Sequence, residues 1–112
     1  MSNITITNTS SSLQFLGGYV IESVEMKNGS ELNGDAVIRL LIENEQYEIR
    51  VSIKKGKKEG VGLLVREDGT LYMRLMFVND VCEGEVTKKN EYGNTVLRGR
   101  VEGGVEVGIW IE

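Results

Sequence analysis

The chain of 112 residues has no histidine, no proline and only one cysteine. Without histidine it lacks the commonest general base and the commonest metal ligand, so we expect no metal site. The single Cys82 excludes an intrachain disulfide, and without a histidine partner it also excludes a Cys-His nucleophile. These absences predict a protein that is not an enzyme, carries no cofactor and works in a reducing compartment.

Long apolar runs and a dominant basic face are also missing. No stretch reaches the roughly 18 apolar residues that a membrane-spanning helix needs, and no apolar signal segment follows the first residue. The net charge is −4, which makes nucleic acid an unlikely partner because such sites need a broad positive surface. We therefore expect a cytoplasmic protein.

Glycine is plentiful, with 14 residues against no proline. Glycine permits tight turns and close backbone approaches, and each one would cost a helix interior about 1 kcal/mol. The apolar residues mostly alternate with polar ones, which is typical of half-buried strands. The sequence thus predicts an all-β protein.

Short strands joined by short turns follow one another from residue 18 onward. The expected strands are 19–26, 36–43, 47–53, 60–66, 71–78, 84–88, 95–102 and 108–111. Residues 36–43 are nearly all apolar, so a helix competes there, but their β-branched content favours a strand. Asn28-Gly29 and Asn33-Gly34 are turn signals, as are residues 43–46, 67–69 and 89–93. This order predicts an antiparallel meander of β-hairpins in one domain, residues 18–112, and residues 1–17 are a polar leader or an edge strand.

Glycines recur at a nearly constant period. Gly34, Gly60, Gly84 and Gly108 can be placed in register, and the first interval is slightly longer than the two equal intervals that follow. Each unit then reads as turn, strand, turn, strand. Stacked hairpins share a core that one hairpin alone could not bury. The predicted structural turn glycines are Gly34, Gly56, Gly60, Gly62, Gly69, Gly84, Gly93, Gly104 and Gly108.

Residues 56–72, GKKEGVGLLVREDGTLY, resemble the core of a MORN repeat (membrane occupation and recognition nexus). Gly56, Gly60, Gly62, Gly69 and Tyr72 fall at the places of that family's glycines and aromatic residue. Partial matches extend over about residues 28–112. The resemblance implies an elongated, twisted antiparallel sheet of hairpins that acts as a scaffold or a partner-binding module.

The chain departs from the family at one repeated position. The family's glycine two residues after the aromatic is replaced here by Ile49, Arg74 and Arg98.

Aromatic residues are few, so those on the repeat are candidates for binding a protein partner. Tyr47 and Tyr72 are expected in one column of the sheet, as core residues or as a binding face. Trp110 lies on the last expected strand, 108–111, whose open edge predicts pairing with another protein or a second copy.

Lys54, Lys55, Lys57 and Lys58 form the one cationic cluster. We expect them in a turn, where they would be a solvated loop or would bind an anionic membrane surface, at about 1 kcal/mol for each lysine.

A small β-sandwich or a closed barrel with similar strands is the alternative fold. It would allow a small-molecule carrier or an enzyme. Glu83 and Glu85 could share a strand face as a catalytic carboxylate pair, although solvent-facing charges are the ordinary explanation.

Overall fold

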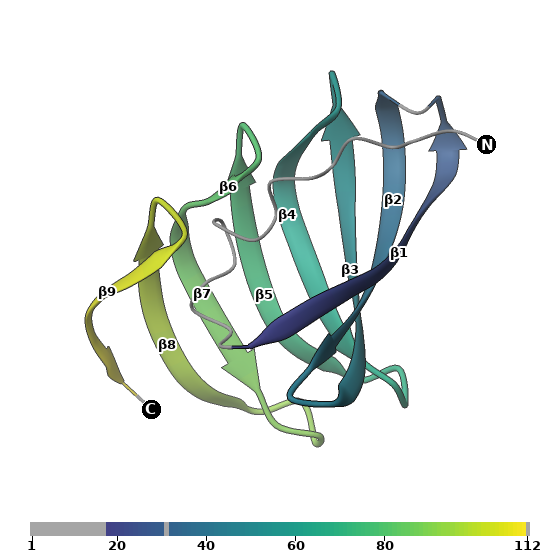
Figure 1. Cartoon of the computed structure of the whole chain (residues 1–112). Coiled ribbons are helices and arrows are strands. Elements are labelled where there is room, and N and C mark those ends of the chain that lie inside the picture. The colour runs from purple at the N-terminus through teal and green to yellow at the C-terminus, as the bar shows by residue number, and fades with distance from the viewer. Residues whose placement is uncertain (1–17, 31, 112) are drawn as a thin grey trace.

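The computed structural model describes residues 18–30 and 32–107 in full and residues 108–111 by their backbone; the predicted leader or edge strand, residues 1–17, lies outside them (Figure 1). The described part forms nine strands. These are β1 (Tyr19–Gly29), β2 (Asn33–Ile42), β3 (Glu45–Lys54), β4 (Lys57–Arg66), β5 (Leu71–Val78), β6 (Val81–Cys82), β7 (Gly84–Lys89), β8 (Thr95–Glu102) and β9 (Val105–Ile111).

The strands form one antiparallel sheet in the order β1-β2-β3-β4-β5-β7-β8-β9, and the short β6 pairs with the end of β5. Apart from the short β6, each strand therefore lies beside its neighbours in sequence, which confirms the predicted all-β hairpin meander. No pairing joins β1 to β9 among the described residues, so the sheet is not closed into a barrel. The apolar run 36–43 lies in and next to β2, which confirms its prediction as a strand.

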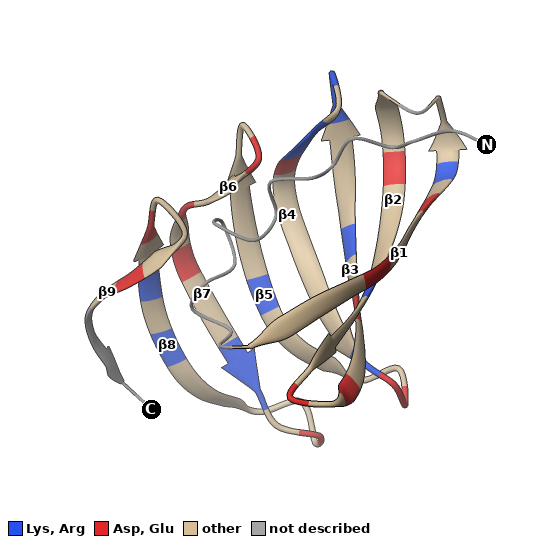
Figure 2. Ribbon diagram, in the orientation of Figure 1, with Lys and Arg blue, Asp and Glu red and all other residues tan. Residues whose placement is uncertain are grey.

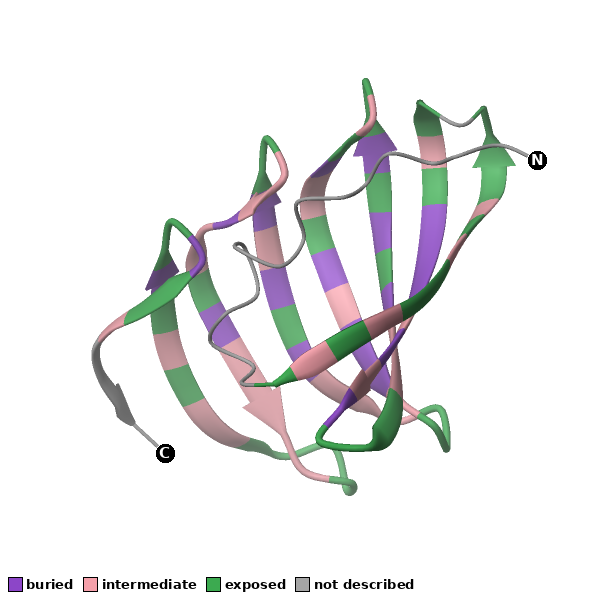
Figure 3. Ribbon diagram, viewed as in Figure 1, coloured by how far each residue is buried: buried purple, intermediate pink, exposed green. Residues whose placement is uncertain are grey.

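The sheet curls, and its inner face carries the core. Buried residues alternate with exposed ones along β3 and β5, as the two-residue repeat of a strand requires (Figure 3). The core cluster is Ala36, Ile38, Leu40, Ile42, Ile49, Val51, Ile53, Leu64, Met73, Leu75, Phe77, Cys82, Val86 and Val101. Tyr19, Ile21, Val24 and Met26 of β1 pack against it, and in Figure 1 the first half of β1 crosses in front of β5, β4 and β3.

The molecule is compact. Its radius of gyration is 13.4 Å, and its principal extents are 42 × 29 × 22 Å. A globular chain of this length is expected at about 13 Å. The molecule is thus more compact than the elongated sheet that the resemblance to MORN repeats implies. The curl of the sheet explains this compact shape, because curling lets the inner faces of distant strands share one core.

Three turns at one end of the sheet repeat at one constant interval along the chain. They are Lys55–Gly56, Asn79–Asp80 and Gly103–Gly104, and their φ pairs are 53° and 80°, 52° and 77°, and 62° and 83°. Two successive residues with positive φ are typical of the two-residue turn that joins twisted antiparallel strands. This interval equals the one that separates Gly60, Gly84 and Gly108, so the predicted period is present in the backbone itself.

Hydrogen bonds repeat with the same offset. A carboxylate oxygen of Glu59 accepts a bond from the N–H of Asn79 at 2.5 Å, and Glu83 accepts one from the N–H of Gly103 at 2.6 Å. At the opposite end of the sheet, the N–H of Gly69 donates to the carbonyl of Arg66 at 2.9 Å, as does that of Gly93 to Asn90 at 3.0 Å. The register shifts after Leu64 and Lys88 are separated by the same interval.

The first unit differs from the others. The two Asn-Gly pairs were expected to form turns, but Asn28-Gly29 ends β1 and Asn33-Gly34 begins β2. Gly29 and Gly34 face each other in the register, with backbones so close that a Cβ on Gly34 would lie 1.7 Å from the carbonyl oxygen of Asn28. Close approach and positive φ, 87° at Gly29 and 148° at Gly34, both require these glycines.

Three other predicted turn glycines also lie inside strands. Gly62 is in mid-β4, where a Cβ would lie 2.6 Å from the Phe77 ring, so it makes room for a core side chain. Gly60 has a φ of 89° at the register shift between β3 and β4, and Gly108 lies within β9. The glycines at residues 56, 69, 93 and 104 do occupy turns, and Gly84 begins β7 with a φ of 98°.

Candidate binding surfaces

Tyr47 and Tyr72 meet on the inner side of the sheet near the turn after β4. Their ring centroids are 5.2 Å apart at an interplanar angle of 36°, and both rings are half-buried against the core cluster. Tyr47 lies opposite Arg66 in the register of β3 and β4, whereas Tyr72 occupies the register shift between β4 and β5. Burial raises the pKa of the Tyr47 hydroxyl, which donates to Glu45 at 3.3 Å.

Two cations lie over the ring of Tyr72. The guanidinium of Arg66 is 4.9 Å from the ring centroid, and the ammonium of Lys88 is 5.2 Å from it. Arg66 also donates to the hydroxyl of Thr70 and to the carbonyls of Leu71 and Lys89. Its bonds hold the turn after β4 against the end of β7, so this cluster closes one end of the core.

The predicted lysine turn is only partly a turn. Lys55 and Gly56 form it, while Lys54 ends β3 and Lys57 begins β4. The three lysines at residues 54, 55 and 57 are exposed and line a shallow cleft of about 420 Å³ together with Glu59 and Asn79. None of these lysines forms an ion pair within the described part of the chain.

Lys58 does not belong to that surface, so its prediction as a lipid-binding residue is wrong. Its side chain is completely buried, and its ammonium lies 2.5 Å from a carboxylate oxygen of Asp80 and 5.4 Å from the Phe77 ring centroid. The alternation of β4 turns it inward. Burial lowers the pKa of Lys58, and Asp80 partly offsets that effect.

β9 is the last strand in the sheet order and pairs only with β8 within the described part. The backbone of Gly108 and Trp110 lies in this strand, but the Trp110 side chain lies outside the described residues. Val105, at the start of β9, is 48% exposed. The predicted open edge, residues 108–111, is therefore part of a longer edge strand that begins at Val105.

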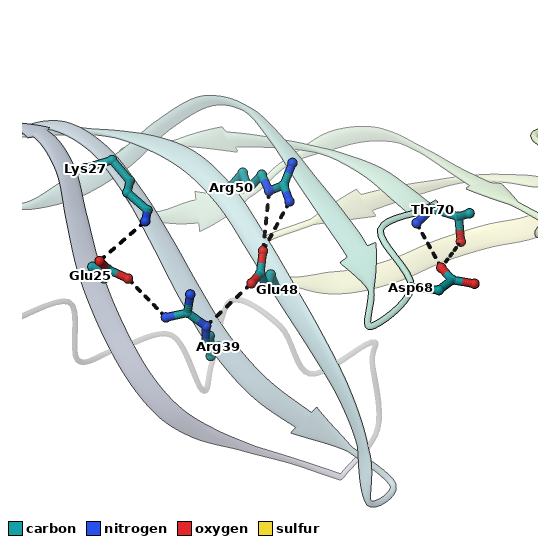
Figure 4. Close-up of polar contacts among 7 residues, drawn as sticks. All are labelled: Glu25, Lys27, Arg39, Glu48, Arg50, Asp68 and Thr70. Atoms are coloured by element: carbon teal, nitrogen blue, oxygen red, sulfur yellow. Dashed lines mark hydrogen bonds and ion pairs between the residues drawn. The ribbon is translucent and has the colours of Figure 1, made fainter.

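A chain of ion pairs crosses the outer face of β1, β2 and β3 (Figure 4). Glu25 contacts Lys27 at 3.4 Å and Arg39 at 3.1 Å, and Glu48 contacts Arg39 at 3.4 Å and Arg50 at 3.3 Å. A neighbouring cleft of about 300 Å³ is lined by polar and charged residues, Arg39, Gln46 and Glu48 among them. This part of the outer face is charged but internally paired.

Groups with catalytic potential are held in structural roles. Cys82 is buried, and burial raises the pKa of its thiol to about 11, which disfavours the reactive thiolate. Glu83 of the expected carboxylate pair caps the turn at Gly103, while Glu85 is exposed on β7. Within the described residues no group of histidine, cysteine, aspartate or glutamate side chains is arranged to hold a metal ion, and no helix is long and apolar enough to cross a membrane.

The alternation rule could have revealed Lys58. Counting back in steps of two from Leu64 places Gly62, Gly60 and Lys58 on the inner face, but the glycines hide this pattern in the sequence. The partner, Asp80, lies in a different hairpin, so no local signal connects the two residues.

Comparisons with protein families, with curated proteins and with solved structures find no match for this chain.

Proposed function

We propose that the chain is a non-enzymatic protein-binding or scaffold module, cytoplasmic and related to the MORN repeats, that associates through its open sheet. The exposed edge strand β9 is the observation that supports this function most directly. An edge strand presents unpaired N–H and C=O groups, which can pair with a strand of a partner or of a second copy. β9 has seven residues, contains no proline, and carries one charged residue, Glu106.

The two-residue turn at Gly103–Gly104 sets the direction of the backbone groups. It makes Glu102 and Val105 a hydrogen-bonded pair, so by the alternation of an antiparallel ladder the N–H of Glu106 points away from β8. Proline at this position removes a donor from the open side and none from the pairing with β8.

Size-exclusion chromatography with light scattering over a concentration series tests this proposal. The mass should rise from 12.5 kDa toward twice that value in the native chain, stay at 12.5 kDa in Glu106→Pro, and rise again in Glu106→Ala, which removes the charge but keeps the N–H. A native chain that stays monomeric at its highest soluble concentration contradicts self-association through β9.

Anionic lipid is a second candidate partner, favoured by Lys54, Lys55 and Lys57 at one tip of the sheet. Leu32, which is 53% exposed, lies beside this tip, because the N–H of Gly56 donates to its carbonyl at 2.9 Å. Flotation with phosphatidylserine vesicles should be reduced by Lys57→Glu and unchanged by Lys58→Met. Equal flotation of Lys57→Glu and the native chain contradicts this candidate.

A further inference from the structure

Three arginines lie in one row on the outer face of the sheet. The register runs from Arg50 in β3 to Leu63 in β4, Arg74 in β5, Thr87 in β7 and Arg98 in β8. The arginines follow one another at the same interval as the turns, so the row is a product of the repeat. In Figure 2 blue bands mark β3, β5 and β8 along this line.

The spacing of the row follows from the sheet. Neighbouring strands lie about 4.8 Å apart, so arginines on every second strand lie about 9.6 Å apart. Leu63 and Thr87, both half-buried, stand between them. The row therefore alternates a cation with a smaller uncharged side chain at each step of about 4.8 Å.

The charges at one end of the row are not neutralised. Arg50 is paired with Glu48, but Arg74 and Arg98 are exposed and form no ion pair within the described residues. This contrasts with the paired charges across β1, β2 and β3. Two free guanidinium groups on a protein with a net charge of −4 form a local site for an anionic partner.

Apolar surface lies beside the row. Val61 is 40% exposed, and it is paired with Met76, which is half-buried, in the next row of β4 and β5. A partner that covers this region would bury apolar side chains between and beside its charged contacts, as protein interfaces do.

We propose that the row binds an acidic amphipathic helix that lies across the strands, with carboxylates recurring every seven residues. Seven residues of a helix rise about 10.5 Å, which matches the spacing of about 9.6 Å between the arginines within the reach of an arginine side chain. Positions three or four residues apart rise about 5 Å, which matches the spacing of about 4.8 Å between neighbouring strands. This inference names a class of partner for the proposed protein-binding function, on which it rests. The partner would bind the outer face of the sheet and not the β9 edge.

Two other anionic partners fit the row less well. An extended peptide places same-face side chains about 6.7 Å apart, which matches neither step. Single-stranded nucleic acid binds where aromatic side chains stack on bases, and the row has Leu63 and Thr87 between its arginines.

The probe is a synthetic helical peptide of about 21 residues, or six helical turns, with glutamate at every seventh position and leucine four residues after each glutamate. One control peptide has the same composition with the glutamates on the opposite face, and a second control is single-stranded DNA of similar charge. Binding is measured by fluorescence anisotropy, and the contact surface by backbone NMR chemical shifts of the native chain.

We expect the probe to bind at least about tenfold more tightly than the face-shifted peptide and to weaken with added salt. The double variant Arg74→Glu/Arg98→Glu should weaken binding by at least about tenfold. Lys57→Glu reverses one unpaired cation at the distant tip, half the charge change of the double variant, and should change binding less than about twofold. Chemical-shift changes in the native chain should centre on β5, β7 and β8, which tests the site even where a variant folds poorly.

Three results overturn the inference. They are equal affinity for the two peptides, equal weakening by Lys57→Glu and the double variant, and tighter binding of DNA than of the probe. Each is independent of the oligomeric state measured for Glu106→Pro, so a failure of edge pairing and a failure of this inference are distinguishable.

Discussion

Removing the charge of Asp80 while Lys58 stays in place should destabilise the protein far more than removing the charge of Lys58. Lys58 is completely buried, and its ammonium has Asp80 as its ion-pair partner at 2.5 Å. Asp80→Asn leaves a buried ammonium without a counter-charge. Breaking a buried pair from one side costs about 3 kcal/mol or more. Asparagine is the suitable replacement, because residue 80 has a φ of 77° and asparagine tolerates that conformation.

Lys58→Met should cost no more than about 1 kcal/mol, because methionine keeps the apolar stem against Phe77 and brings no charge into the core. Asp80 keeps solvent contact, since 18% of its side chain is exposed, and it still accepts a bond from the N–H of residue 58 at 3.3 Å. The double variant Lys58→Met/Asp80→Asn should then resemble Lys58→Met, with a coupling of about 3 kcal/mol.

Urea unfolding of the four proteins measures these differences, and the pH dependence gives a second check. Because the pKa of Lys58 is lowered in the folded state, the unfolded chain binds more protons between that pKa and 10.5, and stability contributed by Lys58 rises with pH in this window. Asp80→Asn removes an effect that raises this pKa, so its deficit relative to the native chain should shrink as pH rises.

Burial raises the pKa of Cys82 to about 11 and that of Tyr19 to about 12, which lowers stability at alkaline pH. The native chain and Asp80→Asn both keep Lys58, which affects the pKa of Cys82, so these effects largely cancel in the difference between those two proteins. Equal losses for Asp80→Asn and Lys58→Met, or a deficit that does not depend on pH, would refute the reasoning.

Three further substitutions test local features. Gly62→Ala should destabilise by about 1–3 kcal/mol because its Cβ would meet the Phe77 ring, and Phe77→Leu in that background should recover part of the loss in urea unfolding. Asp68 accepts bonds from the N–H and hydroxyl of Thr70, which lower its pKa, so the stability it contributes is lost as pH falls below 3.8, and Asp68→Asn should flatten the acid limb of the pH profile. Lys55→Asn should raise the melting temperature, because residue 55 has a φ of 53° and Asn-Gly is the preferred pair for such a turn; a lower temperature contradicts this.

Most of the fold can be predicted from local patterns in the sequence. Alternation along residues 47–53 and 71–78 predicts both the strands and their buried faces, because a strand has only two sides. The turns at Gly69 and Gly93 follow from glycine's freedom to adopt positive φ. The curl of the sheet is different: it depends on register shifts such as the one between Arg50 and Ser52. The Gly60 that lies at this shift cannot be told from the turn glycines by sequence.

The candidate surfaces were less predictable, because they depend on contacts between hairpins. Tyr47 and Tyr72 were expected in one column, but Tyr72 lies at the register shift between β4 and β5. The two cations over its ring, Arg66 and Lys88, come from β4 and β7. The sequence predicts Lys58 in a solvated turn, because nothing in the segment Lys54–Lys58 distinguishes it from the other three lysines. Only the two-residue turn at Lys55–Gly56 sets which lysines face outward.

The repeat allows residues that hold the hairpins together to be distinguished from residues that only form the outer surface. The evenly spaced turn residues, the carboxylates of Glu59 and Glu83 that cap them, and the register shifts recur because each hairpin must meet the next in the same way. No such requirement acts on an outward side chain beside a register shift. Arg74 and Arg98 nevertheless recur there, exposed and without ion pairs among the described residues. The folding of the hairpins does not require these two equivalent unpaired cations, and the proposed binding of an acidic helix would account for both.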